Sequence, residues 1–411
     1  MDSTTHVDGG RASAAAAADP EACGLDAGRL ARLGAMLRRE VEAGRIPGAV
    51  VMVGRHGRLV HVEAVGWRDA GRRDPLRADA IFRIYSMTKP LTAVAGLALV
   101  EEGRLGLGDR VDRYLPRLSR PRVAEPDGRG GIRLVDAWRE LTIHDLLRQT
   151  SGIVGGWAGS EPVSSMYLEA GIRPYDHADS AYARDAQDFV DAIAELPLAH
   201  QPGTVWEYGR SSDVLGRLLE VAADRPLDDL LAERVFRPLG MADTSFHLRP
   251  EAVERAAQPL RETDVPQPAV IDLVRRPRFI SGGSGGLSTA ADYFRFAQML
   301  ARGGELDGSR VLSRHMVDLM TCDHLGPLLG SGPDYIPGPG YGFGLGCAVR
   351  VSPGPAEVPG SPGEFWWLGR ASTSFLVDPT DGLVAVFMIQ KYGQARRYQA
   401  LCKTVLLQAV R

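Results

Sequence analysis

The 411-residue sequence predicts an α/β domain that is built from both ends of the chain and interrupted by a mainly helical domain. Three observations support this prediction. β-Rich runs occur before residue 65 and again after residue 340, and helical patterns flank both groups. Between them, helical segments alternate with loops rich in proline and glycine. The predicted boundaries are a flexible tail at 1–22, an α/β domain at 23–112 and 280–411, and a helical domain at 113–279.

The N-terminal part of the α/β domain is expected to contain a helix followed by a β-hairpin. Apolar residues from 30 to 41 recur at helical spacing, and the pattern ends near Gly44. Residues 49–53 and 59–64 are β-rich, and the sequence Gly54-Arg-His-Gly57 between them is typical of a hairpin turn.

The rest of the chain supplies the other predicted elements. No convincing strand is visible from 111 to 279. After it, Ser288 or Thr289 is placed to cap a helix that runs to Leu300. The predicted helices of the middle region are 143–148, 186–195, 212–223 and 227–235, and the predicted C-terminal elements are strands at 343–351, 365–367, 374–377 and 383–390 and a helix at 399–410.

Composition excludes several function classes. The formal net charge of −3 gives no sign of a nucleic-acid partner or an anionic membrane surface. The four cysteines are scattered with no C-x-x-C spacing, which argues against a zinc ribbon and a disulfide framework. No apolar run approaches the ~20 residues of a membrane helix, and the N-terminus lacks the features of a signal peptide. The sequence therefore predicts a soluble, cytoplasmic protein without membrane or nucleic-acid partners, and it is compatible with a homo-oligomer.

Ser86-Met-Thr-Lys89 is the first candidate for chemistry. Only three of the 48 basic residues are lysine, and lysine, unlike arginine, can lose its proton when desolvated. The apolar stretch 91–100 predicts a buried helix with Ser86 and Lys89 on one face of its first turn. A helix N-terminus presents free N–H groups and favours negative charge, and the lysine can act as base or proton relay. The alternative is a chance match, but the position at the head of an apolar helix favours function.

Ser284 is a competing nucleophile, because Gly282-Gly-Ser284-Gly-Gly286 satisfies G-x-S-x-G. The nucleophile elbow of α/β-hydrolases needs a strand before this motif, a helix directly after it, and an acid and a histidine later in the chain. Only His315 and His324 follow, and His315 is expected on a helix surface. Four glycines in five residues also read well as a turn, which is the favoured interpretation.

Two further stretches are candidates for the site, but each of them alone is weak evidence. Tyr208 stands just before a predicted helix and outside any apolar periodicity, so it is either a general base or an interface tyrosine. In Trp367-Leu-Gly369 the glycine allows a backbone to approach a ligand closely, and a strand-edge N–H there can bind an oxyanion. The alternative for this stretch is a β-bulge with packed tryptophans.

Together these stretches resemble the class C β-lactamase-like serine hydrolases, and most closely their family VIII carboxylesterase branch. The resemblance covers nearly the whole chain, from Pro47 to Met388. It also includes the sequences Ile81-Phe-Arg-Ile-Tyr-Ser-Met-Thr-Lys-Pro90, Asp145-Leu-Leu-Arg-Gln-Thr-Ser-Gly152, Pro238-Leu-Gly-Met-Ala-Asp-Thr244 and Gly303-Gly-Glu-Leu-Asp-Gly308. The implied fold is β-lactamase/transpeptidase-like: an antiparallel sheet flanked by helices, an inserted helical domain, and an active site in the cleft between them.

The resemblance implies a role for each motif. Ser86 would be acylated, Lys89 would be its proton partner and Tyr208 the general base. The oxyanion would be bound by the backbone N–H groups of Ser86 and Arg370. No metal and no organic cofactor is expected. The residues expected to bind substrate are Tyr85, Trp367, Leu368, Gly369 and Arg370.

Departures from the family pattern shift the expected substrate toward esters. Arg210 stands where β-lactamases and peptidases carry asparagine, and Trp367 replaces their lysine, so groups that would hold a β-lactam are missing. Leu368 and Arg370 stand where the esterases commonly have small residues. We expect their bulk to narrow the cleft, and Arg370 to bind a substrate carboxylate. Tyr85 is either a wall of the cleft or a packing residue.

The leading prediction is a serine carboxylesterase that acts on a small-molecule ester. An acyltransferase of secondary metabolism would use the same residues, and a β-lactamase or D-amino-acid peptidase is a further alternative. A binding protein without catalysis would be expected to lack Ser86, Lys89 or Tyr208, and all three are present.

One histidine and one cluster of polar residues are expected to have no catalytic role. His144 lies in a predicted helix, where core packing is favoured. The Asp176, His177 and Asp179 cluster has the residue types of a metal site, but its loop context favours a solvated surface.

Overall fold

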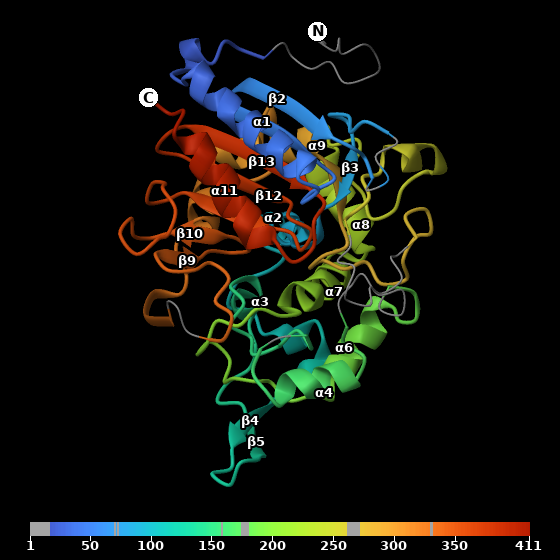
Figure 1. Ribbon diagram of the computed structural model, residues 1–411. Helices are drawn as coiled ribbons and strands as arrows, with labels where there is room; N and C mark the ends of the chain where they lie inside the picture. The colour runs from blue at the N-terminus through green and yellow to red at the C-terminus, as the bar shows by residue number, and fades with distance from the viewer. Residues whose placement is uncertain are drawn as a thin grey trace.

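A seven-stranded antiparallel sheet forms the centre of the computed structural model, which describes residues 17–69, 71, 74–157, 159–173, 181–260, 272–328 and 332–411. The strand order β2-β1-β13-β12-β11-β10-β9 brings both ends of the chain into one sheet (Figure 1), which confirms the predicted antiparallel architecture. The strands are β1 (Gly48–Arg55), β2 (Arg58–Gly66), β9 (Tyr341–Phe343), β10 (Ala348–Arg350), β11 (Phe365–Leu368), β12 (Ser374–Asp378) and β13 (Leu383–Ile389).

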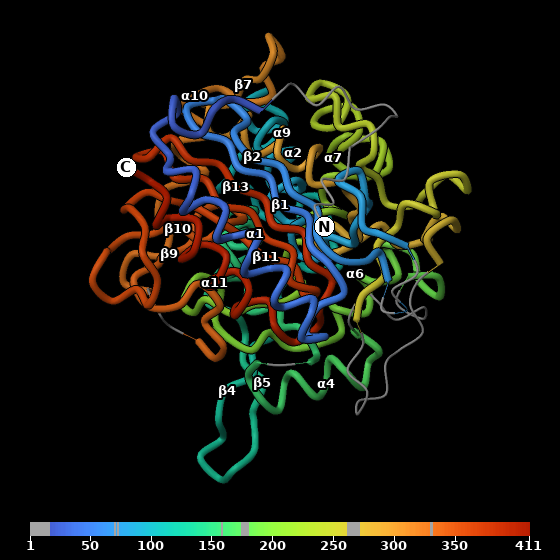
Figure 2. The backbone as a smooth tube through the Cα atoms, turned by 45° about the horizontal axis from the view of Figure 1, so that its top comes forward, coloured from blue at the N-terminus to red at the C-terminus, as the bar shows by residue number. Residues whose placement is uncertain are grey.

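Helices cover both faces of this sheet. On one face α1 and α11 lie side by side (Figure 2), and on the other α9 packs against β1, β12 and β13. Strands β1, β11, β12 and β13 are buried along their whole length, which explains why they read as continuous apolar runs rather than alternating patterns. The helices of this part are α1 (Ala27–Glu42), α2 (Thr88–Glu101), α9 (Ala290–Ala301), α10 (Arg314–Met320) and α11 (Ala395–Leu407).

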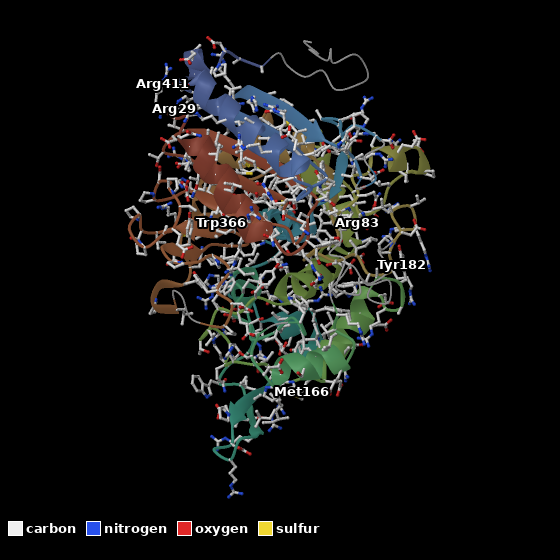
Figure 3. The ribbon with its side chains drawn as sticks, in the orientation of Figure 1. Arg29, Arg83, Met166, Tyr182, Trp366 and Arg411 are labelled. Atoms are coloured by element: carbon white, nitrogen blue, oxygen red, sulfur yellow. The ribbon has the colours of Figure 1, made fainter. Side chains whose placement is uncertain are left out.

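The two ends of the chain are held together beside this sheet. Arg29 of α1 donates to the Gln408 carbonyl at 3.1 Å, and Figure 3 shows Arg29 next to Arg411. The Ala18 N–H donates to the Leu59 carbonyl of β2 at 2.8 Å. The chain is therefore tied to the sheet before residue 22, where the tail was predicted to end, and residues 1–16 lie outside the described part.

The middle of the chain contains several short helices, and it also contains one hairpin that the sequence interpretation missed. Strands β4 (Arg122–Pro126) and β5 (Ile132–Asp136) pair with each other and project from this region (Figure 1). Their side chains are mostly exposed, so they carry no apolar signal. The helices of the region are α3 (Ile143–Leu147), α4 (Val163–Glu169), α6 (Ala186–Ala194), α7 (Ser211–Ala223), α8 (Leu227–Leu231) and a π-helix at Ala232–Phe236.

Two predicted elements differ in detail from the structure. The strand expected at 343–351 is instead the hairpin β9–β10, because the Gly344 N–H donates to the Cys347 carbonyl at 2.8 Å and closes a turn. Of the two expected caps of α9, Thr289 is the actual one, and its Oγ1 accepts from the Asp292 N–H at 3.1 Å. None of the described helices is long and apolar enough to cross a membrane. The remaining strands are β3 (Ile81–Arg83), β6 (Leu287–Thr289), β7 (Glu305–Leu306) and β8 (Ser309–Arg310).

Asp145 fixes the start of α3 to its surroundings. Its buried carboxylate forms a capping box with Thr142 and binds Arg139 and Arg148. Burial acts to raise the pKa of Asp145, but hydrogen bonds from Arg139 and Thr142 hold this pKa below its ordinary value. Asp145 therefore contributes stability above the ordinary carboxyl pKa, and this contribution is lost as the pH falls through the lowered value.

We expect Asp145→Asn to lower the free energy of unfolding by about 2 kcal/mol near neutral pH, because Arg139 and Arg148 both lose their counter-charge. Solvent screens the more exposed of these arginines, Arg139, which limits the size of the effect. The control is Asp185→Ala, which removes the same capping box from the exposed start of α6 and should cost about 1 kcal/mol. Urea unfolding across the acid range checks this prediction. A difference between wild type and Asp145→Asn that does not shrink below about pH 4 would contradict it.

Candidate active site

Ser86 and Lys89 lie at the head of a buried helix. Ser86 is part of the 3-10 turn η2 (Tyr85–Met87), which runs directly into α2, and Lys89 follows on the first turn of that helix. The chain enters η2 from β3, and β3 pairs with β6. Ser86 is partly exposed, whereas only 4% of Lys89 is exposed.

The structure brings Tyr208 to this serine. Its Oη donates to Ser86 Oγ at 2.6 Å, and Lys89 Nζ lies 4.5 Å from the centre of the Tyr208 ring. The lysine also donates to the Gly283 carbonyl at 2.8 Å. A cation placed over an aromatic ring is attracted by the π electrons of that ring. The three predicted catalytic residues therefore lie together: Tyr208 is hydrogen-bonded to Ser86, and Lys89 lies against the Tyr208 ring.

Glu207, the buried residue directly before Tyr208, ties this segment to its surroundings. Glu207 accepts from the Ser160 N–H at 2.7 Å and from Ser160 Oγ at 2.8 Å, and it also binds His200 Nε2. This group is no second catalytic triad, because serine and glutamate both contact the same nitrogen of His200 and a triad uses the two ring nitrogens separately. Sequence reasoning missed this group, since its members share no recognisable spacing.

The Gly282–Gly286 loop is a turn, as favoured from the sequence, and not a nucleophile elbow. In the described residues 272–280 no strand precedes it, and the short strand β6 follows where an elbow needs a helix. The loop packs against α2, and the Gly286 N–H donates to Thr88 Oγ1 at 2.9 Å. A Cβ on Gly286 would lie 2.8 Å from that oxygen, so glycine is needed for the close approach.

Strand β11 carries the third motif to the head of α2. Trp367 is fully buried, and its ring centre lies 5.8 Å from that of Tyr208. A Cβ on Gly369 would lie only 2.3 Å from the Ile84 carbonyl oxygen. The backbone at the end of β11 therefore runs against the segment that leads into Ser86, where an oxyanion hole formed by two N–H groups is expected.

Leu368 lies on the other face of β11 from Trp367. Alternation along the strand places it with Trp366 (Figure 3), whose ring packs edge-on against Tyr341. Tyr341 accepts a hydrogen bond from Lys403 of α11 at 2.9 Å. The structure therefore groups Leu368 with the face that α11 covers and not with the tyrosine and serine.

Arg370 and Tyr85 lie beside the motif. Arg370 is exposed, and its guanidinium lies 5.8 Å from the centre of the Tyr392 ring. Tyr85 is buried with Ala371 and Tyr392 and is hydrogen-bonded to the Tyr392 hydroxyl. Its backbone is left-handed with φ 46°, a conformation that persists only when the surroundings hold it. These contacts show Tyr85 in a packing position directly before Ser86.

His144, expected to have a packing role, links α3 to a loop of the C-terminal part. Its Nε2 is hydrogen-bonded to His324 Nδ1 at 2.9 Å. Burial, assisted by the nearby Arg148, lowers the pKa of His144 to about 4, so it is neutral near pH 7. The predicted surface cluster at Asp176, His177 and Asp179 lies outside the described residues.

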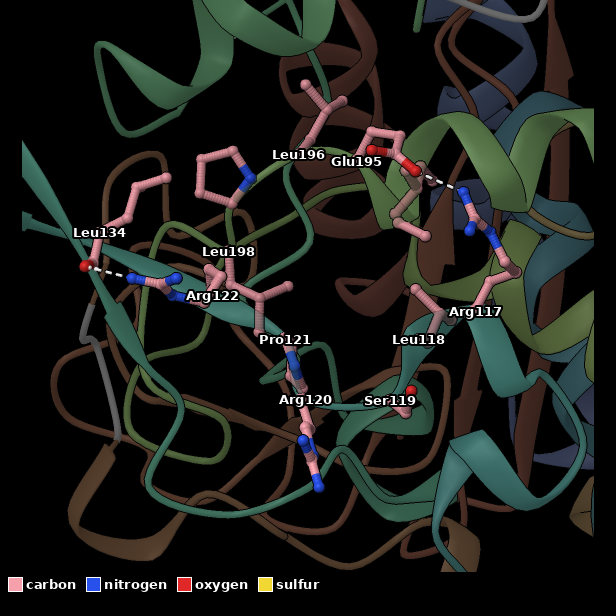
Figure 4. A pocket seen from close by; sticks show the side chains of 13 residues that line it. Arg117, Leu118, Ser119, Arg120, Pro121, Arg122, Leu134, Glu195, Leu196 and Leu198 are labelled. Atoms are coloured by element: carbon pink, nitrogen blue, oxygen red, sulfur yellow. Dashed lines mark hydrogen bonds and ion pairs between the residues drawn. The ribbon is translucent and has the colours of Figure 1, made fainter.

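A small cavity of about 100 Å³ lies between the β4–β5 hairpin and the end of α6, and none of the predicted site residues lines it (Figure 4). Two of its arginines are already engaged: Arg122 donates to the Leu134 carbonyl and Arg117 pairs with Glu195. Across the described part of the chain, no three histidine, cysteine or carboxylate side chains are placed to hold a metal ion.

The fold and the serine, lysine and tyrosine group define a class of serine hydrolases built like class C β-lactamases. The Beta-lactamase family matches residues 33–408, and the chain belongs to that family.

Its relatives include esterases. The chain is 37% identical over 372 residues to Protein Rv1367c of Mycobacterium tuberculosis, covering 87% of this chain and 88% of that protein. It is 33% identical over 398 residues to Esterase EstB of Burkholderia gladioli, covering 91% and 94%. Among solved structures, EstCE1, "a hydrolase with promiscuous acyltransferase activity", matches with a TM-score of 0.76 at 25% identity, covering 92% and 98%. These similarities confirm the predicted family resemblance and fold.

We expect Gly369→Ala to lower kcat/KM for p-nitrophenyl butyrate by about 100-fold or more, the usual effect of losing one oxyanion donor. The added Cβ would force the end of β11 away from Ile84. The control is Gly108→Ala, where a Cβ would meet nothing within 4 Å. Full activity of Gly369→Ala, with an unchanged circular dichroism spectrum, would show that this close approach is not needed.

Proposed function

We propose that the protein is a serine carboxylesterase of the family VIII type, which hydrolyses small esters through an acyl-enzyme on Ser86. One observation carries this proposal: the Tyr208 hydroxyl lies 2.6 Å from Ser86 Oγ while the buried Lys89 ammonium lies against the same tyrosine ring. A serine is a weak nucleophile unless a neighbouring base takes its proton. Packing alone gives no reason to bring a buried cation and a phenol to a partly exposed serine.

The geometry supports a two-step mechanism. Ser86 Oγ attacks the ester carbonyl carbon as its proton passes to the phenolate oxygen of Tyr208, which acts as the general base. The N–H groups of Ser86 and Arg370 stabilise the oxyanion. The carbon–oxygen bond to the alcohol then breaks, and the alcohol leaves with the proton. In the second step water attacks the acyl carbon, Tyr208 takes a proton from the water, and Ser86 leaves with that proton.

The positions of Arg210 and Trp367 support an ester over a β-lactam substrate. Only 2% of Arg210 is exposed, and its guanidinium pairs with Asp213 at 3.1 Å, so it does not replace the asparagine of β-lactamases as a substrate ligand. Trp367 presents an indole beside Tyr208 where β-lactamases carry lysine. An apolar wall without these polar groups suits an ester better than a β-lactam.

The substrate contacts follow from the same geometry. Trp367 and Gly369 border the serine and tyrosine group, and Arg370 supplies its backbone N–H and an exposed side chain for a substrate carboxylate. Tyr85 and Leu368 contribute indirectly, because their packing holds η2 and β11 in place.

We expect Ser86→Ala to lower the hydrolysis of p-nitrophenyl butyrate by about 10³-fold or more, and Ser284→Ala to retain most of it, because Ser284 lies in the turn that supports α2. Mass spectrometry of quenched wild-type enzyme should locate one butyryl group on the peptide that contains Ser86. An active Ser86→Ala enzyme, or an acyl group on another residue, would overturn the proposed nucleophile.

Acyl transfer to an alcohol is the second candidate function, because the structurally similar EstCE1 is a hydrolase with promiscuous acyltransferase activity. With a saturating vinyl ester and increasing 1-butanol, an acyltransferase should form butyl ester in proportion to the alcohol, while the vinyl group leaves as acetaldehyde. A hydrolase should instead give the free acid as the main product at every alcohol concentration. The ratio of ester to acid measured by gas chromatography decides between them.

A further inference from the structure

Asp213 is a buried carboxylate that the proposed mechanism leaves without a role. It lies in the first turn of α7, and only 1% of it is exposed. Its Oδ2 pairs with Arg210 at 3.1 Å, and its Oδ1 accepts from Ser281 Oγ and from the Gly283 N–H, the latter at 3.1 Å. A buried charge is unfavourable unless it is paired and hydrogen-bonded. Two of the three partners, Ser281 and Gly283, belong to the loop that holds Lys89.

Two successive peptide groups of this loop are each held at both ends. The peptide between Gly282 and Gly283 accepts from Thr92 Oγ1 at 2.8 Å and donates its N–H to Asp213. In the next peptide, the Ser284 N–H donates to Ser281 Oγ at 3.1 Å, and the Ser281 hydroxyl donates in turn to Asp213. The carbonyl of this second peptide is the Gly283 oxygen.

The Gly283 carbonyl oxygen is the hydrogen-bond acceptor of Lys89 Nζ, at 2.8 Å. A peptide group is planar, so fixing the Ser284 N–H also fixes the direction of the Gly283 carbonyl. The contact between Asp213 and the loop is tight as well, because a Cβ on Gly283 would lie 2.8 Å from Asp213 Oδ2.

The other side of Asp213 is anchored by Arg210. The Arg210 guanidinium lies 4.8 Å from the centre of the Phe189 ring and 5.9 Å from that of Phe279, and these two rings stack on each other at 4.6 Å. Cation–π contacts in a desolvated site hold such a guanidinium firmly. Asp213 is therefore fixed between an immobile cation and the glycine-rich loop.

We propose that Asp213 is a positioning residue for catalysis, which acts through Ser281 and Gly283 to orient Lys89 beneath the Tyr208 ring. This inference rests on the proposed function, because the direction of Lys89 matters to the rate only where Ser86 is the nucleophile. It also explains why Arg210 occupies its position: the arginine supports the carboxylate that supports the lysine.

The test removes the link to the loop and leaves the ion pair intact. Asp213→Ala is unsuitable by itself, since it leaves Arg210 buried without a counter-charge. Ser281→Ala deletes the hydroxyl that links Asp213 to the Ser284 N–H. Thr92→Val deletes the hydrogen bond to the Gly282 carbonyl with little change in side-chain shape. Ser288→Ala is the matched control, because this equally buried serine binds Thr244 and does not contact Asp213.

We expect Ser281→Ala and Thr92→Val to lower kcat and the single-turnover acylation rate with p-nitrophenyl butyrate by about 10- to 100-fold, the usual effect of a misplaced catalytic group. KM should change by less than about twofold, and the melting temperatures should match that of Ser288→Ala, since a purely structural role would alter stability and not kcat alone.

Two results would count against the proposal, and they are distinguishable. If Ser281→Ala acylates as fast as Ser288→Ala while Ser86→Ala is inactive, Asp213 has no positioning role and the proposed function stands. If Ser86→Ala is as active as wild type, the proposed function fails first and the inference fails with it.

Discussion

The burial of the Lys89 ammonium is the constraint on which the site depends. A cation with 4% exposure must be compensated inside the fold, and here a carbonyl oxygen and an aromatic ring do so. A carboxylate in the same place would bind the lysine tightly and compensate its charge. A neutral carbonyl instead holds the ammonium in place and leaves its field directed at the tyrosine. The glycines of the loop follow from this arrangement, because only backbone that lacks side chains can approach α2 so closely.

The fold places the site where segments from three parts of the chain meet. The serine and lysine come from the β3–α2 connection, the tyrosine from the segment before α7, and the glycine loop and Trp367 from the C-terminal part. The sheet itself closes only when β13 pairs with β1. The contacts of Tyr208 with Ser86 and of Lys89 with Gly283 are therefore long-range in sequence, and the site depends on the assembly of distant parts of the chain rather than on one local motif.

The sequence revealed the parts of this site that are local and missed those that are not. Ser86 and Lys89 share a helical spacing, and the central strands are apolar along their length, so both could be predicted. The β4–β5 hairpin has exposed strands and gave no such signal. The Asp213 network joins residues that are 68 and 70 positions apart, and no periodicity connects them. The face of β11 on which Leu368 lies is set by how β11 pairs with the neighbouring strands. The sequence alone does not reveal this pairing.

The distribution of lysines has a practical consequence. Of the three lysine side chains, Lys89 and Lys403 are buried, and Lys391 is the one with partial exposure. Its N–H donates to the Ala371 carbonyl at 2.9 Å, in the turn that packs on Tyr85. Reagents that couple to lysine side chains will therefore attach mainly at Lys391, whose backbone contacts the turn that packs on Tyr85. A protein that is immobilised or dye-labelled through its lysine side chains would therefore be attached mainly at this one position, whereas attachment through the many surface carboxylates of Asp and Glu spreads over the rest of the molecule.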